Sequence, residues 1–127
     1  MQFLLDTHTF IWFINGDHLL PEKVINDIKN VNNKCFISVA SIWEIAIKYK
    51  LNKLELQSGF DRILDFLTNN QIEMLPITFE HIQTLNTLDF HHRDPFDRLI
   101  ISQGVYEKLT IITKDKNFKK YTVKVQW

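Results

Sequence analysis

Acidic residues stand at four places in the sequence where the chain is expected to pass between a strand and a helix. The clearest is Arg93-Asp94-Pro95-Phe96-Asp97-Arg98, which predicts the start of a helix. Asp94 occupies the expected N-cap, Pro95 the first helical position, and Asp97 falls in the first turn, facing back toward the cap. Taken alone, both acids are explained as capping residues that oppose the helix dipole. The acids in comparable places are Asp6, Glu44 and Asp115.

Brought together, these acids would favour one kind of chemistry. In a parallel sheet, the carboxyl ends of the strands and the N-termini of the following helices meet at one edge. Carboxylates gathered there would raise one another's pKa and oppose folding, a conflict that a divalent cation resolves. Oxygen donors without His/Cys ligand spacing suit Mg²⁺ or Mn²⁺ rather than zinc. A carboxylate cluster that leaves water on such a metal suits phosphodiester hydrolysis. No P-loop or dinucleotide glycine motif competes with this interpretation.

Short apolar runs alternate with amphipathic helical patterns along the chain. Strands are expected at residues 3–5, 35–38, 72–75, 109–113 and, at a sheet edge, 122–125. Helices are expected at 9–14, from Pro21, after the second strand, around 60–69, at 78–85 with Thr78 as cap and Glu80 in support, and from Asp94 to about Leu109. A turn or short helix is expected at 117–120. This alternation predicts the α/β class: a three-layer α/β/α domain over residues 1–127 with a mostly parallel sheet of about five strands.

The register of the helix that carries Glu44 stays open. Ser41 and Glu44 are three residues apart and could form a capping box, which would make Glu44 a structural residue. A helix that begins nearer Ser38 would instead place Glu44 inside the helix, facing the strand ends. The sequence does not decide between the two.

The overall charge limits the ways in which this protein could bind nucleic acid. Lys+Arg and Asp+Glu are both 15, which argues against non-specific binding driven by net charge. A nucleic-acid role would need a metal or a local basic surface. The basic concentrations are Lys48, Lys50 and Lys53, and Lys114, Lys116, Lys119, Lys120 and Lys124, for which solvated faces remain the default interpretation.

Cysteine usage and apolar segments predict the compartment. Cys35 is the only cysteine, so no internal disulfide can form, and we expect a buried, inert thiol in a reducing cytosol. The apolar run before Asp6 is too short for a signal peptide, and no run approaches the roughly 20 residues needed to span a bilayer. We therefore expect a soluble cytoplasmic protein with no membrane partner.

The segments around the acids resemble a known family. They are Leu4-Leu5-Asp6-Thr7-His8, Ile37 to Ile45, Arg93 to Ile100, and Ile112-Thr113-Lys114-Asp115. In order and approximate spacing they look like the PIN-domain nucleases, most closely the VapC-like toxins of bacterial toxin–antitoxin pairs. The resemblance implies a Mg²⁺- or Mn²⁺-dependent endoribonuclease that cleaves RNA, usually a homodimer, held inactive by an antitoxin protein.

The resemblance also assigns roles by position. Asp6, Glu44, Asp97 and Asp115 match the acids that hold the metal and carry catalysis, and Asp94 matches a supporting acid. Thr113 and Ser38 resemble hydroxyl residues that orient carboxylates. Gly104 departs from the family, which often has alanine there; glycine at a helical position costs about 1 kcal/mol.

Several other residues have open interpretations. His8 and Arg98 are candidates for RNA contact, although Arg98 could equally pair with a carboxylate. His8, His91 and His92 are more simply explained as polar residues at a cleft rim. Trp12, Phe13, Trp43 and Tyr49 are expected mostly in the core, with a dimer or antitoxin surface as the alternative, and Trp127 is expected to pack against something. The rival functions are a non-catalytic interaction module, a nuclease with a DNA or ribosome-processing substrate, and a phosphoacceptor receiver-like domain.

Overall fold

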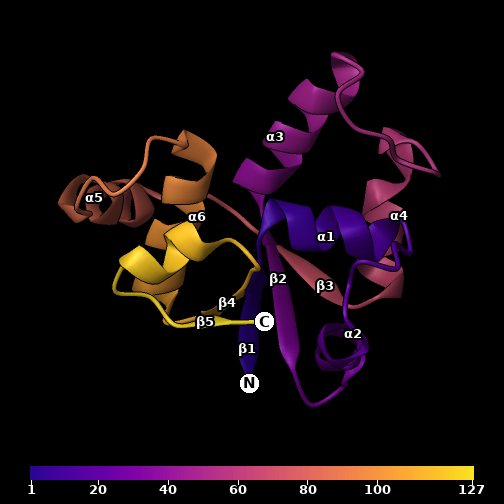
Figure 1. Ribbon diagram of the computed structural model, residues 1–127, viewed down its shortest axis with the longest axis horizontal. Helices are drawn as coiled ribbons and strands as arrows, with labels where there is room; N and C mark the ends of the chain where they lie inside the picture. Colours follow the sequence, from indigo (N-terminus) through magenta and orange to yellow (C-terminus); the bar gives the residue numbers. More distant parts are fainter.

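A five-stranded parallel sheet organises the fold in the computed structural model, which describes residues 1–127 (Figure 1). Its strands lie side by side in the order β3-β2-β1-β4-β5, and every neighbouring pair is parallel. Their bounds are β1 (Gln2–Leu5), β2 (Lys34–Ser38), β3 (Ile72–Leu75), β4 (Thr110–Ile112) and β5 (Val125–Gln126). The predicted sheet is confirmed, including the edge position of the last strand. That strand begins later than predicted, because pairing with β4 starts only at Val125.

The helices connect the strands in the predicted alternation. They are α1 (Thr7–Ile14), α2 (Glu22–Lys29), α3 (Val39–Lys50), α4 (Ile63–Asn69), α5 (Phe79–Thr87) and α6 (Pro95–Glu107), with 3-10 turns η1 (Phe60–Arg62) and η2 (Lys116–Lys120). Helix α1 begins two residues earlier than predicted, because Asp6 accepts a hydrogen bond from the Thr9 amide and is the N-cap. Helix α6 ends at Glu107 rather than near Leu109, because Lys108 adopts a left-handed conformation. None of these helices combines the length and the apolar character needed to cross a membrane.

Alternate residues of the central strand point into two apolar cores. Phe3 and Leu5 of β1 pack with side chains from α1, α2 and α4, whereas Leu4 packs with Ile100 and Ile101 of α6. Figure 1 accordingly shows α5 and α6 on one side of the sheet and α1, α2 and α4 on the other. The three-layer α/β/α prediction is confirmed. Helix α3 extends from the carboxyl end of β2, above the sheet (Figure 1).

Helix α5 is fastened to α6 by a buried histidine that the sequence interpretation overlooked. The cap is Thr78, as predicted, but its partner is His81 and not Glu80. The His81 Nδ1 accepts from the Thr78 amide at 3.0 Å, and Nε2 lies 2.7 Å from Glu107 Oε2 on α6. Capping and interhelical docking therefore share one side chain.

Some aromatic residues predicted for the core lie at the surface. Phe13 is buried, but Trp43 is 57% exposed and Tyr49 39% exposed, both on α3. Trp127 packs edge-on against Trp12, with ring centroids 6.0 Å apart. Cys35 is buried as predicted, and its burial raises the thiol pKa to about 11, as expected for an inert cysteine.

Gly104 is required by close packing. A Cβ at this position would lie 2.9 Å from Ile111 Cδ1 and 3.1 Å from Val123 Cγ2. The helix-propensity gain of about 1 kcal/mol from alanine is outweighed by overpacking costs of roughly 1–3 kcal/mol. We expect Gly104→Ala to lower the free energy of unfolding by about 1 kcal/mol, measured by urea denaturation.

A double-mutant cycle isolates the cause. Ile111→Val removes the nearest methyl group, so Gly104→Ala should cost less in the Ile111→Val background than in the wild type. Equal costs in the two backgrounds would contradict the packing explanation.

Candidate metal-binding site

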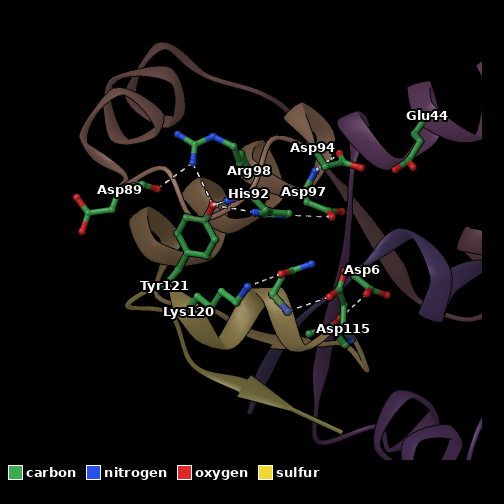
Figure 2. Close-up of polar contacts among 12 residues, drawn as sticks. Asp6, Glu44, Asp89, His92, Asp94, Asp97, Arg98, Asp115, Lys120 and Tyr121 are labelled. Atoms are coloured by element: carbon green, nitrogen blue, oxygen red, sulfur yellow. Dashed lines mark hydrogen bonds and ion pairs between the residues drawn. The ribbon is translucent and has the colours of Figure 1, made fainter.

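The predicted site acids gather at the carboxyl ends of β1 and β4. Asp6 directly follows β1, and Asp115 follows β4 after two residues. Strand order reverses direction between β1 and β4, which is where ligands bind in open parallel sheets. Figure 2 shows the carboxyl groups of Asp94 and Asp97, from the start of α6, facing those of Glu44 and Asp6.

Asp6 is a buried carboxylate held by two hydrogen bonds. Its Oδ1 accepts from the Thr9 amide at 2.7 Å, and its Oδ2 accepts from the Thr113 hydroxyl. Burial raises the pKa of Asp6 above its usual range, although these hydrogen bonds and the nearby His8 lower it. The helix cap and the sheet edge thus fix the orientation of one acid.

Asp97 has the most perturbed charge at the site. Burial, and after it the charges of Asp94, Glu44, Asp115 and Asp6, together raise its pKa to about 8. Asp94 is the N-cap of α6, as predicted, and its Oδ1 accepts from the Asp97 amide at 3.0 Å. The other predicted acids are therefore all close enough for their charges to raise the pKa of Asp97.

The structure decides the register of Glu44. Ser38 is the N-cap of α3, so Glu44 lies inside the helix and is only 4% exposed. Its Oε2 lies 2.8 Å from Lys48 Nζ, one turn later. Its Oε1 is buried and has no hydrogen-bond partner, an unusual condition for a buried carboxylate oxygen.

The remaining predicted residues occupy distinct positions. Asp115 is exposed and caps η2, accepting from the Asn117 amide at 2.9 Å. Thr113 contacts Asp6 as expected and accepts from the Asp115 amide, so it links two of the acids. The expectation for Ser38 is not met, because its hydroxyl accepts from the Ala40 amide and touches no carboxylate.

The side chains of the two candidates for RNA contact form no hydrogen bond or ion pair with the carboxyl groups of the site. His8 is exposed and packs edge-on near Trp12. Arg98 is 7% exposed and forms no ion pair. Its Nη1 donates to the Asp89 carbonyl and the Tyr121 hydroxyl, so the guanidinium is committed inside the protein.

His92 is a site residue to which the sequence interpretation gave a peripheral role. Its Nε2 lies 3.3 Å from Asp97 Oδ2, and its Nδ1 lies 2.8 Å from the Tyr121 hydroxyl. In the sequence, its position two residues before the Asp94 cap was only a weak indication that it belongs to the site. Its second partner is 29 residues away along the chain, so no local pattern could reveal the contact.

The donor set fits a hard divalent cation. Two observations show negative charge without enough counter-charge: the unpartnered Glu44 Oε1 and the raised pKa of Asp97. As placed, no three carboxyl or imidazole groups are close enough to ligate one ion directly. Mg²⁺ usually keeps several waters and takes one or two protein carboxylates, so an ion at this spacing would be held partly through its waters.

The fold and the acidic cluster define an α/β protein with a carboxylate site at the strand ends. The chain belongs to the PIN domain family, whose model matches residues 3–124. PIN domains are nucleases that generally use divalent metal ions, so membership supports a nuclease.

Solved structures confirm the fold over the whole chain. The VapBC2 structure from Rickettsia felis, bound to a promoter DNA fragment, has a TM-score of 0.78 and 22% identity, covering 100% of this chain and 99% of that chain. The DNA-bound VapBC structure from Salmonella typhimurium has a TM-score of 0.74 and 17% identity, covering 99% and 97%. VapBC-1 from nontypeable Haemophilus influenzae has a TM-score of 0.70 and 17% identity, covering 99% and 97%. No curated protein sequence matches.

Proposed function

We propose that this protein is a Mg²⁺- or Mn²⁺-dependent endoribonuclease and the toxin of a toxin–antitoxin pair. The observation that carries the proposal is the acidic cluster at the ends of β1 and β4, where burial and the neighbouring carboxylates together raise the pKa of Asp97 to about 8. Strongly perturbed pKa values caused by burial and like charges cluster at functional sites.

The acids have separable roles in this proposal. Asp6, Glu44, Asp97 and Asp115 would hold the hydrated metal, at most two of them directly and the others through its waters, and Asp94 would support the site as the cap of α6. When bound, the ion supplies an activated water and stabilises charge at the scissile phosphate. Thr113 holds the Asp6 carboxylate in place, and the unpartnered Glu44 Oε1 offers an open donor.

Exposed lysines beside the site favour a polyanionic substrate. Lys114, Lys116, Lys119 and Lys120 are all exposed on the segment that surrounds Asp115. Basic side chains next to carboxylates let a backbone of phosphates approach an otherwise acidic site. Because the overall formal charge is zero, net charge adds no attraction of its own to this local effect.

The structural neighbours support an antitoxin partner, since their names describe VapBC complexes. Helix α3 and its C-cap residue expose Trp43, Ile47 and Leu51, and exposed apolar side chains gathered in one place mark protein–protein contacts. A cytoplasmic homodimer whose activity is blocked by a bound antitoxin is the assembly that we propose.

The test is cleavage of labelled total RNA by the purified protein, with Mn²⁺, Mg²⁺ or EDTA, beside the Asp6→Asn variant. We expect discrete RNA products with either metal, none in EDTA and none with the variant. Asparagine is isosteric and can still cap α1, so the variant should fold, which a thermal melt verifies. Single-stranded DNA of matched sequence tests whether the substrate is RNA.

Each result has a definite meaning. Cleavage in EDTA, or by the variant, would contradict the metal-dependent mechanism. Preferential DNA cleavage would reassign the substrate within the nuclease class. The non-catalytic interaction module would be favoured by a folded protein that binds Mn²⁺, cleaves neither RNA nor DNA, and does not arrest growth when its expression is induced in a bacterial host.

A further inference from the structure

A chain of hydrogen bonds connects a buried guanidinium to the Asp97 carboxylate. Arg98 Nη1 donates to the Tyr121 hydroxyl at 3.0 Å, this hydroxyl lies 2.8 Å from His92 Nδ1, and His92 Nε2 lies 3.3 Å from Asp97 Oδ2. Figure 2 shows this chain running from Arg98 through Tyr121 and His92 to the acidic cluster. It joins the last loop of the protein to the start of α6.

The donors and acceptors can be assigned from the chemistry of each group. The Tyr121 hydroxyl accepts from Arg98 Nη1 and from the His92 amide at 3.3 Å, which occupies both of its lone pairs. Its single hydrogen is therefore donated to His92 Nδ1. A neutral imidazole that accepts at Nδ1 carries its proton on Nε2, where it faces Asp97 Oδ2. Every bond in the chain thus donates in the direction of Asp97.

The surroundings hold this chain in one geometry. Arg98 and Tyr121 are buried, and the guanidinium stacks on Phe90 at 4.3 Å while Nη1 also donates to the Asp89 carbonyl at 2.9 Å. The His92 side chain is 13% exposed, and its ring packs against Tyr121 and Phe118. His92 therefore approaches Asp97 from a fixed direction.

We propose that His92, oriented by Tyr121 and Arg98, is a positioning residue that holds Asp97 Oδ2 and leaves Oδ1 available to a divalent cation. The inference rests on the proposed function and deepens it. Asp97 Oδ1 has no hydrogen-bond partner, while Oδ2 is engaged by His92. Partners that orient a metal-binding side chain typically contribute 10–100-fold to metal affinity.

Two substitutions of His92 separate positioning from packing. The glutamine amide reaches about as far as the histidine Nε2, whereas the asparagine amide reaches only as far as Nδ1. His92→Gln can therefore still donate to Asp97, and His92→Asn cannot. In electron paramagnetic resonance titrations with Mn²⁺ and no RNA, we expect His92→Asn to weaken Mn²⁺ binding by roughly 10–100-fold and His92→Gln to restore most of it.

His91→Asn is the matched control. His91 packs edge-on against the same Tyr121 ring, at 4.8 Å between centroids, but it is exposed and its side chain forms no hydrogen bond or ion pair with an acid. It should leave Mn²⁺ affinity unchanged. Equal affinity in His92→Asn and wild type, or equal loss in His92→Asn and His92→Gln, would overturn the positioning role. Wild-type protein that binds no Mn²⁺ would overturn the proposed function and this inference together.

The tautomer is a second, metal-free readout. Long-range ¹H–¹⁵N spectra distinguish Nε2-protonated from Nδ1-protonated imidazole. We expect the Nε2–H form for His92 in EDTA, and a change in its ¹⁵N shifts in Tyr121→Phe, which removes only the hydroxyl. An Nδ1–H tautomer in the wild type would show that His92 does not donate to Asp97. It would overturn the positioning role whether or not the protein cleaves RNA.

Discussion

Replacing Asp97 by asparagine is expected to lower RNA cleavage by on the order of 10²–10³-fold, the size of effect seen when one preorganised electrostatic group is removed. The same variant should be more stable than the wild type in EDTA at pH 8. Asp97 carries the charge that burial and four neighbouring acids disfavour, with a pKa raised to about 8. Neutral asparagine removes that cost and keeps an oxygen for the His92 Nε2–H.

Asp97→Asn is expected to lose activity and gain stability. A misfolded variant would lose both, so this combination excludes misfolding as the cause of inactivity. The measurements are RNA cleavage with Mn²⁺ and thermal melts in EDTA at pH 8. Asp61→Asn is the control, because Asp61 is an exposed acid in η1 outside the site; it should change neither quantity. An Asp97→Asn variant that cleaves normally would remove Asp97 from the catalytic site. A variant that is both inactive and less stable would indicate a structural role.

Local signals predicted the frame of this site well. Asp94-Pro95 marks a helix start because an N-cap acid and a proline at N1 act within one turn. The strand at Ile72–Leu75 was predicted with its observed bounds, because a short apolar run stopped by proline needs no distant partner. The common edge of a parallel sheet then predicted that these local features form one carboxylate cluster, and the family resemblance assigned roles to the acids.

Non-local contacts account for what the sequence did not reveal. Ser38 and Ser41 are equally good caps locally, but α3 begins directly after β2 with Ser38 as its cap, and the Ser41 hydroxyl instead accepts from the Thr7 hydroxyl of α1. His81 and His92 have partners 26 and 29 residues away, so their roles depend on how α5, α6 and the last loop pack. Trp43 is a large apolar residue of the kind expected in a core, yet it is exposed on α3, which extends beyond the sheet.

The second large effect concerns pH and divalent metal. In EDTA, the free energy of unfolding should fall as pH rises from about 5 to 8. The folded-state pKa of Asp97 is about 8, against 3.8 in the unfolded chain. Between these values the folded state binds more protons than the unfolded state, so raising the pH favours unfolding. Asp6, whose pKa burial also raises, acts in the same direction.

The expected loss over this window is on the order of 3 kcal/mol, since one pKa unit corresponds to about 1.4 kcal/mol before relaxation. Mn²⁺ at about 100 times its dissociation constant should restore roughly 2.7 kcal/mol. The stabilisation by Mn²⁺ should be larger at pH 8 than at pH 5, because protons compete with the metal for the carboxylate oxygens. Urea denaturation at both pH values, with Mn²⁺ or EDTA, measures both effects.

Asp97→Asn is the control variant, in which the pH dependence of stability should flatten. A wild type whose stability is constant or rises from pH 5 to 8 in EDTA would show that the acids are not held in mutual repulsion.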